Sequence, residues 1–140
     1  KAKALFEAMA KASASGLISA AHDCSEGGIG VAAAEMAFSG GRGMDIFLKD
    51  VFYVPGSGNV SNAQARSDTV LFSESHSRFI VEVSPEHQKA FERVMKDVPF
   101  SLAGRVTESK EFQVYGLNGK LCVKADLNDL KEAWQKPLRW

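Results

Sequence analysis

The chain has 140 residues, of which 45% are hydrophobic and 24% are charged, and this size and composition are typical of one soluble globular domain. Lysine plus arginine equals aspartate plus glutamate at 17 each, so no net field favours binding to nucleic acid or to an anionic membrane. Neither a signal-peptide pattern nor an apolar run near the roughly 20 residues that cross a bilayer occurs. We therefore expect a cytoplasmic domain without nucleic-acid or membrane partners, and the two cysteines, Cys24 and Cys122, fit a reducing compartment.

Helices and strands alternate in the N-terminal part of the sequence. An alanine-rich helix is predicted over residues 2–14, followed by a short buried strand over 17–22. Apolar residues then recur at helical spacing over about 26–39, and a further strand is predicted over 44–48. The chain starts at Lys1 rather than at methionine and is helical in pattern almost at once, which suggests a C-terminal fragment of a longer subunit.

Residues 55–68 break this pattern, because they are rich in glycine, serine and asparagine and offer almost nothing to bury. They are predicted to form a long loop or an insertion within the single domain 1–140. A loop of this length can be a functional lid or a surface elaboration. Its lack of aromatic and catalytic groups favours the surface elaboration.

The C-terminal part adds strands and two helices. Runs rich in β-branched and aromatic residues predict three strands, over 78–83, 101–106 and 112–115. Ser84 as N-cap and Pro85 at the first helical position predict a helix after the first of these strands, and Asp126 starts the last helix. The Asn118-Gly119 pair predicts a tight hairpin. Alternating elements together with a hairpin indicate an α+β fold, an α/β sandwich in which helices cover a mixed sheet.

The most informative segment is the polar turn from His22 to Gly28, between the predicted strand and the helix that follows it. A glycine-bearing turn that starts a helix can direct backbone N–H groups and a partial positive charge at an anion. Asp23 is a hard carboxylate of the kind that binds Mg²⁺, and Ser25 has a hydroxyl that can contact a phosphate. Gly27 and Gly28 lack side chains and would let a ligand approach the backbone closely.

Each residue of this turn also has a structural interpretation. Ser25 would cap the helix, Asp23 would cap it or form an ion pair, and the glycines would serve tight packing. The chemistry of the turn alone favours neither these structural interpretations nor a phosphate site. The turn matches no Walker or Rossmann motif. His22 is predicted to be a structural hydrogen-bonding residue, because adjacent strand residues point to opposite faces. Cys24 lacks the spacing of a zinc ligand, and its position beside a histidine does not indicate a nucleophile.

A second unusual stretch, Leu71–Arg78, leads directly into the strand predicted over 78–83. Its polar side chains could face a ligand or a partner domain. The preferred interpretation of this stretch alone is a capped turn, with Glu74 and Arg78 as a solvated ion pair worth at most about 1 kcal/mol.

Several stretches together resemble one enzyme family. The sequence from Leu17 to Ala37, with His-Asp-Cys-Ser-Glu-Gly-Gly at its centre, resembles a turn and helix in the synthetase subunit of phosphoribosylformylglycinamidine (FGAM) synthase, in its last domain. Further stretches resemble other signatures of that family, namely Leu71–Ser75 before Arg78–Val81, Gly104–Val106, and Leu130–Trp134. The resemblance runs in register over nearly the whole chain except residues 55–68, and the joint match is what makes it specific.

This resemblance implies a C-terminal α/β domain of the superfamily that includes aminoimidazole ribonucleotide synthetase. FGAM synthase uses ATP and Mg²⁺ to convert formylglycinamide ribonucleotide and glutamine-derived ammonia into formylglycinamidine ribonucleotide in de novo purine biosynthesis. The implied partners are the N-terminal domains of the same subunit, a glutamine amidotransferase subunit and a small bridging subunit. The chain alone is expected to be inactive, because the family's catalytic residues lie in other domains, and no catalytic residue is assigned to it.

The resemblance also implies roles for the turn. Asp23 would ligate Mg²⁺ and Ser25 would contact a nucleotide, ATP or ADP, in an auxiliary site that holds the nucleotide without performing the reaction. Gly27 and Gly28 would lie beside its phosphates, an expectation that rests on their chemistry more than on the family. The alternatives are another member of the superfamily, a selenophosphate synthetase or a hydrogenase-maturation dehydratase, or a non-enzymatic interaction module that docks through its C-terminal tryptophans.

Overall fold

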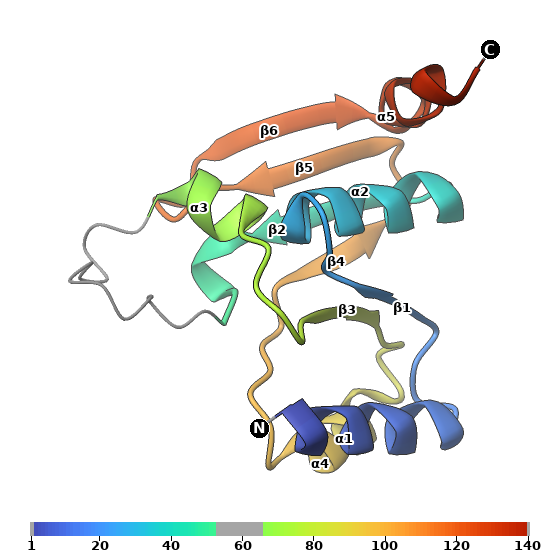
Figure 1. Ribbon diagram of the computed structural model, residues 1–140, viewed down its shortest axis with the longest axis vertical. Coiled ribbons are helices and arrows are strands. Elements are labelled where there is room, and N and C mark those ends of the chain that lie inside the picture. Colours follow the sequence, from blue (N-terminus) through green and yellow to red (C-terminus); the bar gives the residue numbers. More distant parts are fainter. Residues whose placement is uncertain (1, 53–65, 140) are drawn as a thin grey trace.

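The computed structural model describes residues 2–52 and 66–139. In Figure 1 a mixed sheet with helices packed on it occupies one end of the molecule, and a two-stranded sheet with a pair of helices occupies the other. This arrangement confirms the predicted α+β class. No helix in the described ranges is long and apolar enough to cross a membrane.

The larger sheet has four strands in the order β4-β2-β5-β6. β2 (Gly43–Phe47) pairs antiparallel with β4 (Gly104–Thr107) and parallel with β5 (Glu111–Tyr115), so the sheet is mixed, as predicted. β5 pairs antiparallel with β6 (Leu121–Asp126) across the predicted hairpin turn, in which Gly119 has a φ of +74°. Glycine reaches this left-handed conformation without strain, which is why the Asn-Gly pair was informative.

Helices cover one face of this sheet, namely α2 (Gly28–Gly40), α3 (Ser67–Phe72) and α5 (Leu127–Gln135). Alternate strand residues point to this face because side chains along a strand alternate in direction. Small side chains on α2 let the helix approach them closely. The core they form includes Met44, Ile46, Phe112 and Val114 from the strands and Ala33 and Ala37 from α2.

The smaller part pairs β1 (Ala20–Asp23) antiparallel with β3 (Phe79–Glu82), and it packs α1 (Ala2–Ala14) against α4 (Gln88–Met95). Its separate core contains Ala12, Phe91, Met95 and Val98. Because β1 runs directly into α2, the turn between them joins the two parts of the molecule (Figure 1).

Two local predictions are wrong in this region. The strand predicted over 17–22 is Ala20–Asp23, and its residues alternate between partly buried and exposed instead of being buried. A two-stranded sheet with helices on one side leaves the other face to solvent, which explains the alternation. The helix predicted to start directly after Ser84 begins at Gln88, and the Ser84 side chain does not cap it, because a turn through residues 85–87 comes first. The cap predicted at Asp126 is present, since its carboxylate accepts from Asn128 N at 2.7 Å.

Most of the loop predicted over 55–68 lies outside the described residues. Its last part is described, and there the prediction is wrong, because Ser67 and Asp68 begin α3. Asp68 lies in the first turn of that helix, where a carboxylate interacts favourably with the helix dipole. Val70 and Leu71, two and three residues after Asp68, are buried in the core, so packing that the local composition does not reveal stabilises this short helix.

Candidate nucleotide and metal site

The turn between β1 and α2 is held in place by β3 and by the segment before it. Asp23 pairs with Phe79, and Cys24 N donates to Arg78 O at 2.9 Å. Gly28 has a φ of +59°, and a Cβ there would lie 2.5 Å from Ser73 O. The space that a side chain at Gly28 would fill is thus occupied by the backbone of Ser73, a part of the chain itself. The backbone of the turn is closely packed at this position, and only glycine fits there.

Asp23 and Ser25 lie together on the exposed side of the turn. Ser25 Oγ donates to Asp23 Oδ2 at 2.7 Å, and Ser25 does not cap α2, whose N-cap residue is Gly27 with no side-chain cap bond. The pKa of Asp23 is lowered from its ordinary value of 3.8, first by the Ser25 hydrogen bond and then by a backbone N–H. The turn thus presents an ionised, exposed carboxylate with a hydroxyl beside it, a donor pair of the kind that Mg²⁺ and phosphate ligands use.

The two predicted phosphate neighbours use their N–H groups within the chain. Gly27 N donates to Glu74 Oε1 at 2.9 Å, and Gly28 N donates to Ser25 O at 3.1 Å. A carboxylate of the protein therefore already lies at the positive end of α2, the place where an anionic ligand would bind. Glu74 was considered in the sequence only as a partner of Arg78, and that expectation is wrong.

Arg78 instead fixes the start of the segment that carries Glu74. Its Nη1 donates to Ser73 O at 3.0 Å and to Ser73 Oγ at 2.8 Å. Polar groups of the stretch Ser73–Ser77 therefore form hydrogen bonds beside the turn. The polar composition of the stretch is visible in the sequence, but the partners of these groups are not.

His22 contacts a different part of the molecule. Its Nε2 lies 2.8 Å from Glu35 Oε2 on α2, and its Nδ1 lies 2.6 Å from the carbonyl oxygen of Asp23. The predicted hydrogen-bonding role of His22 is confirmed. Glu35 could not be predicted as the partner of His22, because no local motif marks it.

The remaining turn residue, Cys24, is buried, and both cysteines are free. Burial is the largest influence on its thiol and raises the pKa, the charge of Arg78 lowers it, and Asp23 raises it further. A buried thiol with a raised pKa is a poor nucleophile, which agrees with the sequence-based exclusion. Within residues 2–52 and 66–139 no group of three or more His, Cys, Asp or Glu side chains is arranged to hold a metal ion. A cation at Asp23 would therefore take its other ligands from a phosphate, from water or from another domain.

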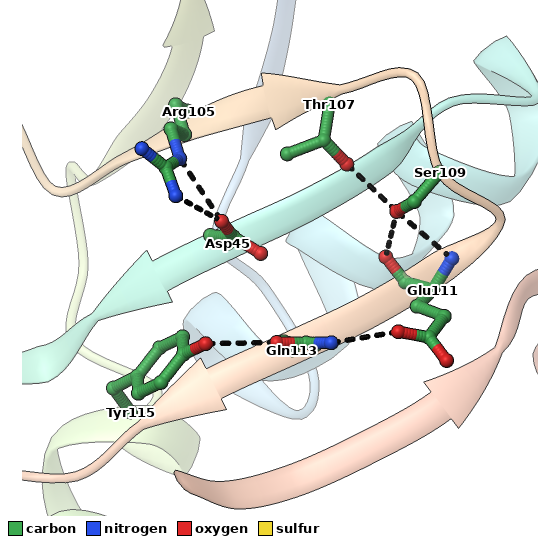
Figure 2. A network of polar contacts seen from close by, with 7 residues as sticks. All are labelled: Asp45, Arg105, Thr107, Ser109, Glu111, Gln113 and Tyr115. Carbon is green, nitrogen blue, oxygen red and sulfur yellow. Dashed lines mark hydrogen bonds and ion pairs between the residues drawn. The ribbon is translucent and has the colours of Figure 1, made fainter. Parts of the chain in front are cut away.

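A second polar cluster lies on the sheet face opposite α2, as Figure 2 shows. Arg105 Nε and Nη2 both lie 2.9 Å from Asp45 Oδ2, which joins β4 to β2. On β5, Tyr115 donates to Gln113 at 2.8 Å, and Gln113 donates to Glu111 at 2.7 Å. The Arg105–Asp45 bonds cross between two strands and the β5 bonds run along one strand, and these groups satisfy one another, so we assign them to the stability of the sheet and not to a binding site.

The fold and the turn define an α+β domain in which a glycine-bearing helix start lies beside exposed carboxylates. A family model described as AIR synthase related protein, C-terminal domain, matches residues 1–116. The match covers most of the chain, and the chain belongs to this family.

Relatives and solved structures agree with this assignment. The phosphoribosylformylglycinamidine synthase subunit PurL of Deinococcus radiodurans is 33% identical over 124 residues, which are 89% of this chain and 15% of that protein. The PurL of Caldanaerobacter subterraneus is 34% identical over 142 residues, covering 100% of this chain and 17% of that protein. Thermotoga maritima PurL complexed with FGAR has a TM-score of 0.76 at 25% identity, covering 92% of this chain and 20% of that one. The chain thus spans less than a fifth of the length of these two PurL relatives.

Proposed function

We propose that the chain is the C-terminal domain of the synthetase subunit of FGAM synthase. The observation that carries this proposal is the similarity to PurL, which extends over the whole of this chain at 34% identity. The subunit would take part in the ATP-dependent conversion of formylglycinamide ribonucleotide and ammonia into formylglycinamidine ribonucleotide, a step of de novo purine biosynthesis. Thermotoga maritima PurL complexed with FGAR and with ADP, each 25% identical to this chain, supports these substrate classes.

Within that subunit, the turn would hold a nucleotide and Mg²⁺. The Asp23 carboxylate, exposed and with its pKa lowered, would ligate the cation, and the Ser25 hydroxyl would contact the nucleotide. Mg²⁺ would neutralise charge on the phosphate oxygens. Gly27 would meet a phosphate only by exchanging its bond to Glu74 for one to the ligand, because that carboxylate occupies the same N–H group.

The partners we propose are the N-terminal domains of the subunit, a glutamine amidotransferase subunit and a small bridging subunit, in the cytoplasm. A Thermotoga maritima structure of PurLQS has the fold of this chain, with a TM-score of 0.74 at 22% identity. Its description as PurLQS supports an assembly of several subunits for that protein, and we extend such an assembly to this one.

A reaction assay tests the proposal. The full-length subunit that contains this chain is supplied with ATP, Mg²⁺, formylglycinamide ribonucleotide and ammonia, and the release of ADP and formylglycinamidine ribonucleotide is measured. We expect turnover by the full-length subunit and none by residues 1–140 alone. Turnover of a different amide or acid substrate, with none of this one, would contradict the proposal.

A further inference from the structure

Glu35 joins three elements of the fold. It lies on α2, and its two carboxylate oxygens serve two different partners. Oε2 lies 2.8 Å from His22 Nε2 on β1, and Oε1 accepts from Trp134 Nε1 on α5 at 2.7 Å. Its side chain is 24% exposed, and the bond to His22 is partly buried, where it is stronger than on an open surface, whereas the bond from Trp134 is exposed.

The contact with His22 extends to the predicted metal ligand. The second ring nitrogen of His22, Nδ1, lies 2.6 Å from the carbonyl oxygen of Asp23 and 3.7 Å from Asp23 Oδ1. Because Glu35 holds one side of the ring, the other side lies against the main-chain carbonyl of Asp23, with the Asp23 carboxylate beyond hydrogen-bond distance but within the range of an ion pair. Asp23 itself is 66% exposed in its side chain, and within the described part of the chain its carboxylate accepts a side-chain hydrogen bond from the hydroxyl of Ser25 alone.

Attachment of α5 to α2 does not depend on Glu35. The ring of Trp134 packs on Phe38 with centroids 6.0 Å apart, and Leu130 packs on the main core. These apolar contacts hold the helices together without a carboxylate. What Glu35 adds is a fixed orientation for the His22 ring.

We propose that Glu35 is a positioning residue for the Asp23 carboxylate, acting through His22, so that Asp23 presents its free oxygen to Mg²⁺ in one orientation. This inference rests on the proposed role of Asp23. Groups that contact a metal ligand and orient it contribute to metal affinity without touching the metal.

The test uses the full-length subunit and measures how tightly ADP binds, by titration calorimetry, with and without Mg²⁺. Glu35→Ala is expected to raise the Mg²⁺ concentration for half-maximal ADP binding about tenfold, the lower end of the range for outer-shell partners. The affinity for ADP without Mg²⁺ should not change, because Glu35 is proposed to act on the metal ligand alone. A general fold defect would instead lower the affinity for ADP both with and without Mg²⁺. Glu35→Gln, which keeps one acceptor oxygen and the side-chain volume, should give a smaller shift with the fold retained.

A double variant shows whether Glu35 acts through His22. Since the two residues form one chain of contacts, Glu35→Ala combined with His22→Ala should shift the Mg²⁺ requirement no further than the larger single change. Glu132→Gln is the matched control, because among the residues that the structure describes the carboxylate of this α5 glutamate pairs with the surface residue Arg139 alone. An unchanged Mg²⁺ requirement in Glu35→Ala, an equal loss of ADP affinity without Mg²⁺, or effects that multiply in the double variant would each overturn the proposal.

Asp23→Asn separates this inference from the function on which it rests. If Asp23→Asn raises the Mg²⁺ requirement and Glu35→Ala does not, the positioning role alone is wrong. If Asp23→Asn leaves the requirement unchanged, the metal role of Asp23 is wrong, and the role of Glu35 is overturned with it.

Discussion

Two aspartates in this molecule are used in opposite ways. Asp45 on β2 has a side chain only 12% exposed, and both of its bonds from Arg105 come from a strand 60 residues away in the sequence. Asp23 at the end of β1 has a side chain 66% exposed, and among the described residues the side-chain hydrogen bond to its carboxylate comes from Ser25, two residues on, with the His22 ring 3.7 Å away. The carboxylate of Asp45 is committed to joining two strands, whereas that of Asp23 remains available. The same residue type thus stabilises the sheet in one place and can bind a ligand in the other.

Asp23 can offer a free carboxylate at a fixed place only if the turn that carries it is tightly packed. Replacing Gly28 in this turn is expected to give the largest change in stability. Gly28→Ala would combine a left-handed φ with a clash on the backbone of residue 73, and we expect it to lower the free energy of unfolding by about 2–4 kcal/mol. Gly119→Ala is the matched control, because Gly119 also has a positive φ but nothing within 4 Å of its Cβ position. It should cost about 1 kcal/mol. Urea denaturation gives both values, and equal costs would contradict a tightly packed turn.

The second prediction compares the two aspartates directly. Asp45→Asn removes the charge that Arg105 contacts in a nearly buried place, and we expect it to lower the free energy of unfolding by about 1–2 kcal/mol. Asp23→Asn should lower the stability of the ligand-free chain much less than Asp45→Asn does, because the Asp23 carboxylate is exposed and its hydrogen-bond partner is the nearby Ser25. Thermal and urea unfolding of the two variants measure the difference. A loss of stability in Asp23→Asn as large as in Asp45→Asn would show that Asp23 is also committed to the fold.

The third and smallest effect concerns pH. Because the folded-state pKa of Asp23 lies below its ordinary value of 3.8, ionised Asp23 stabilises the fold above that pH. This contribution is lost as the pH falls through the lower folded-state pKa. Ser25→Ala removes the largest cause, so the titration midpoint of the Asp23 carboxyl, followed by ¹³C NMR, should rise. A midpoint that does not move in Ser25→Ala would mean that the hydroxyl does not hold the carboxylate.

Much of the fold could be predicted from the sequence because its signals are local. The periodicity of residues 2–14, the Asn118-Gly119 turn and the Asp126 cap depend on neighbours within a few positions, and the structure has all three. The segment that carries Ser67 and Asp68 was missed, because packing of its apolar residues on distant elements stabilises that helix.

The residues of the turn could be chosen from the sequence, but their partners could not. The bond from Gly27 to Glu74 spans 47 residues, and the bond from Trp134 to Glu35 spans 99. No local pattern encodes pairs so far apart. From the sequence, Ser25 could be either the N-cap of the helix or a ligand contact. The structure excludes the first role, because Gly27, in a left-handed conformation, is the N-cap residue of α2.

The central claim is that Asp23 holds a nucleotide and Mg²⁺ without performing the reaction. The most direct test is to purify the full-length subunit with Asp23→Ala and to measure its bound nucleotide, its bound Mg²⁺ and its turnover together. We expect the variant to lose most of its bound nucleotide and Mg²⁺, with a smaller effect on the chemical step. Turnover lower by several orders of magnitude, with the bound nucleotide fully retained, would contradict the account.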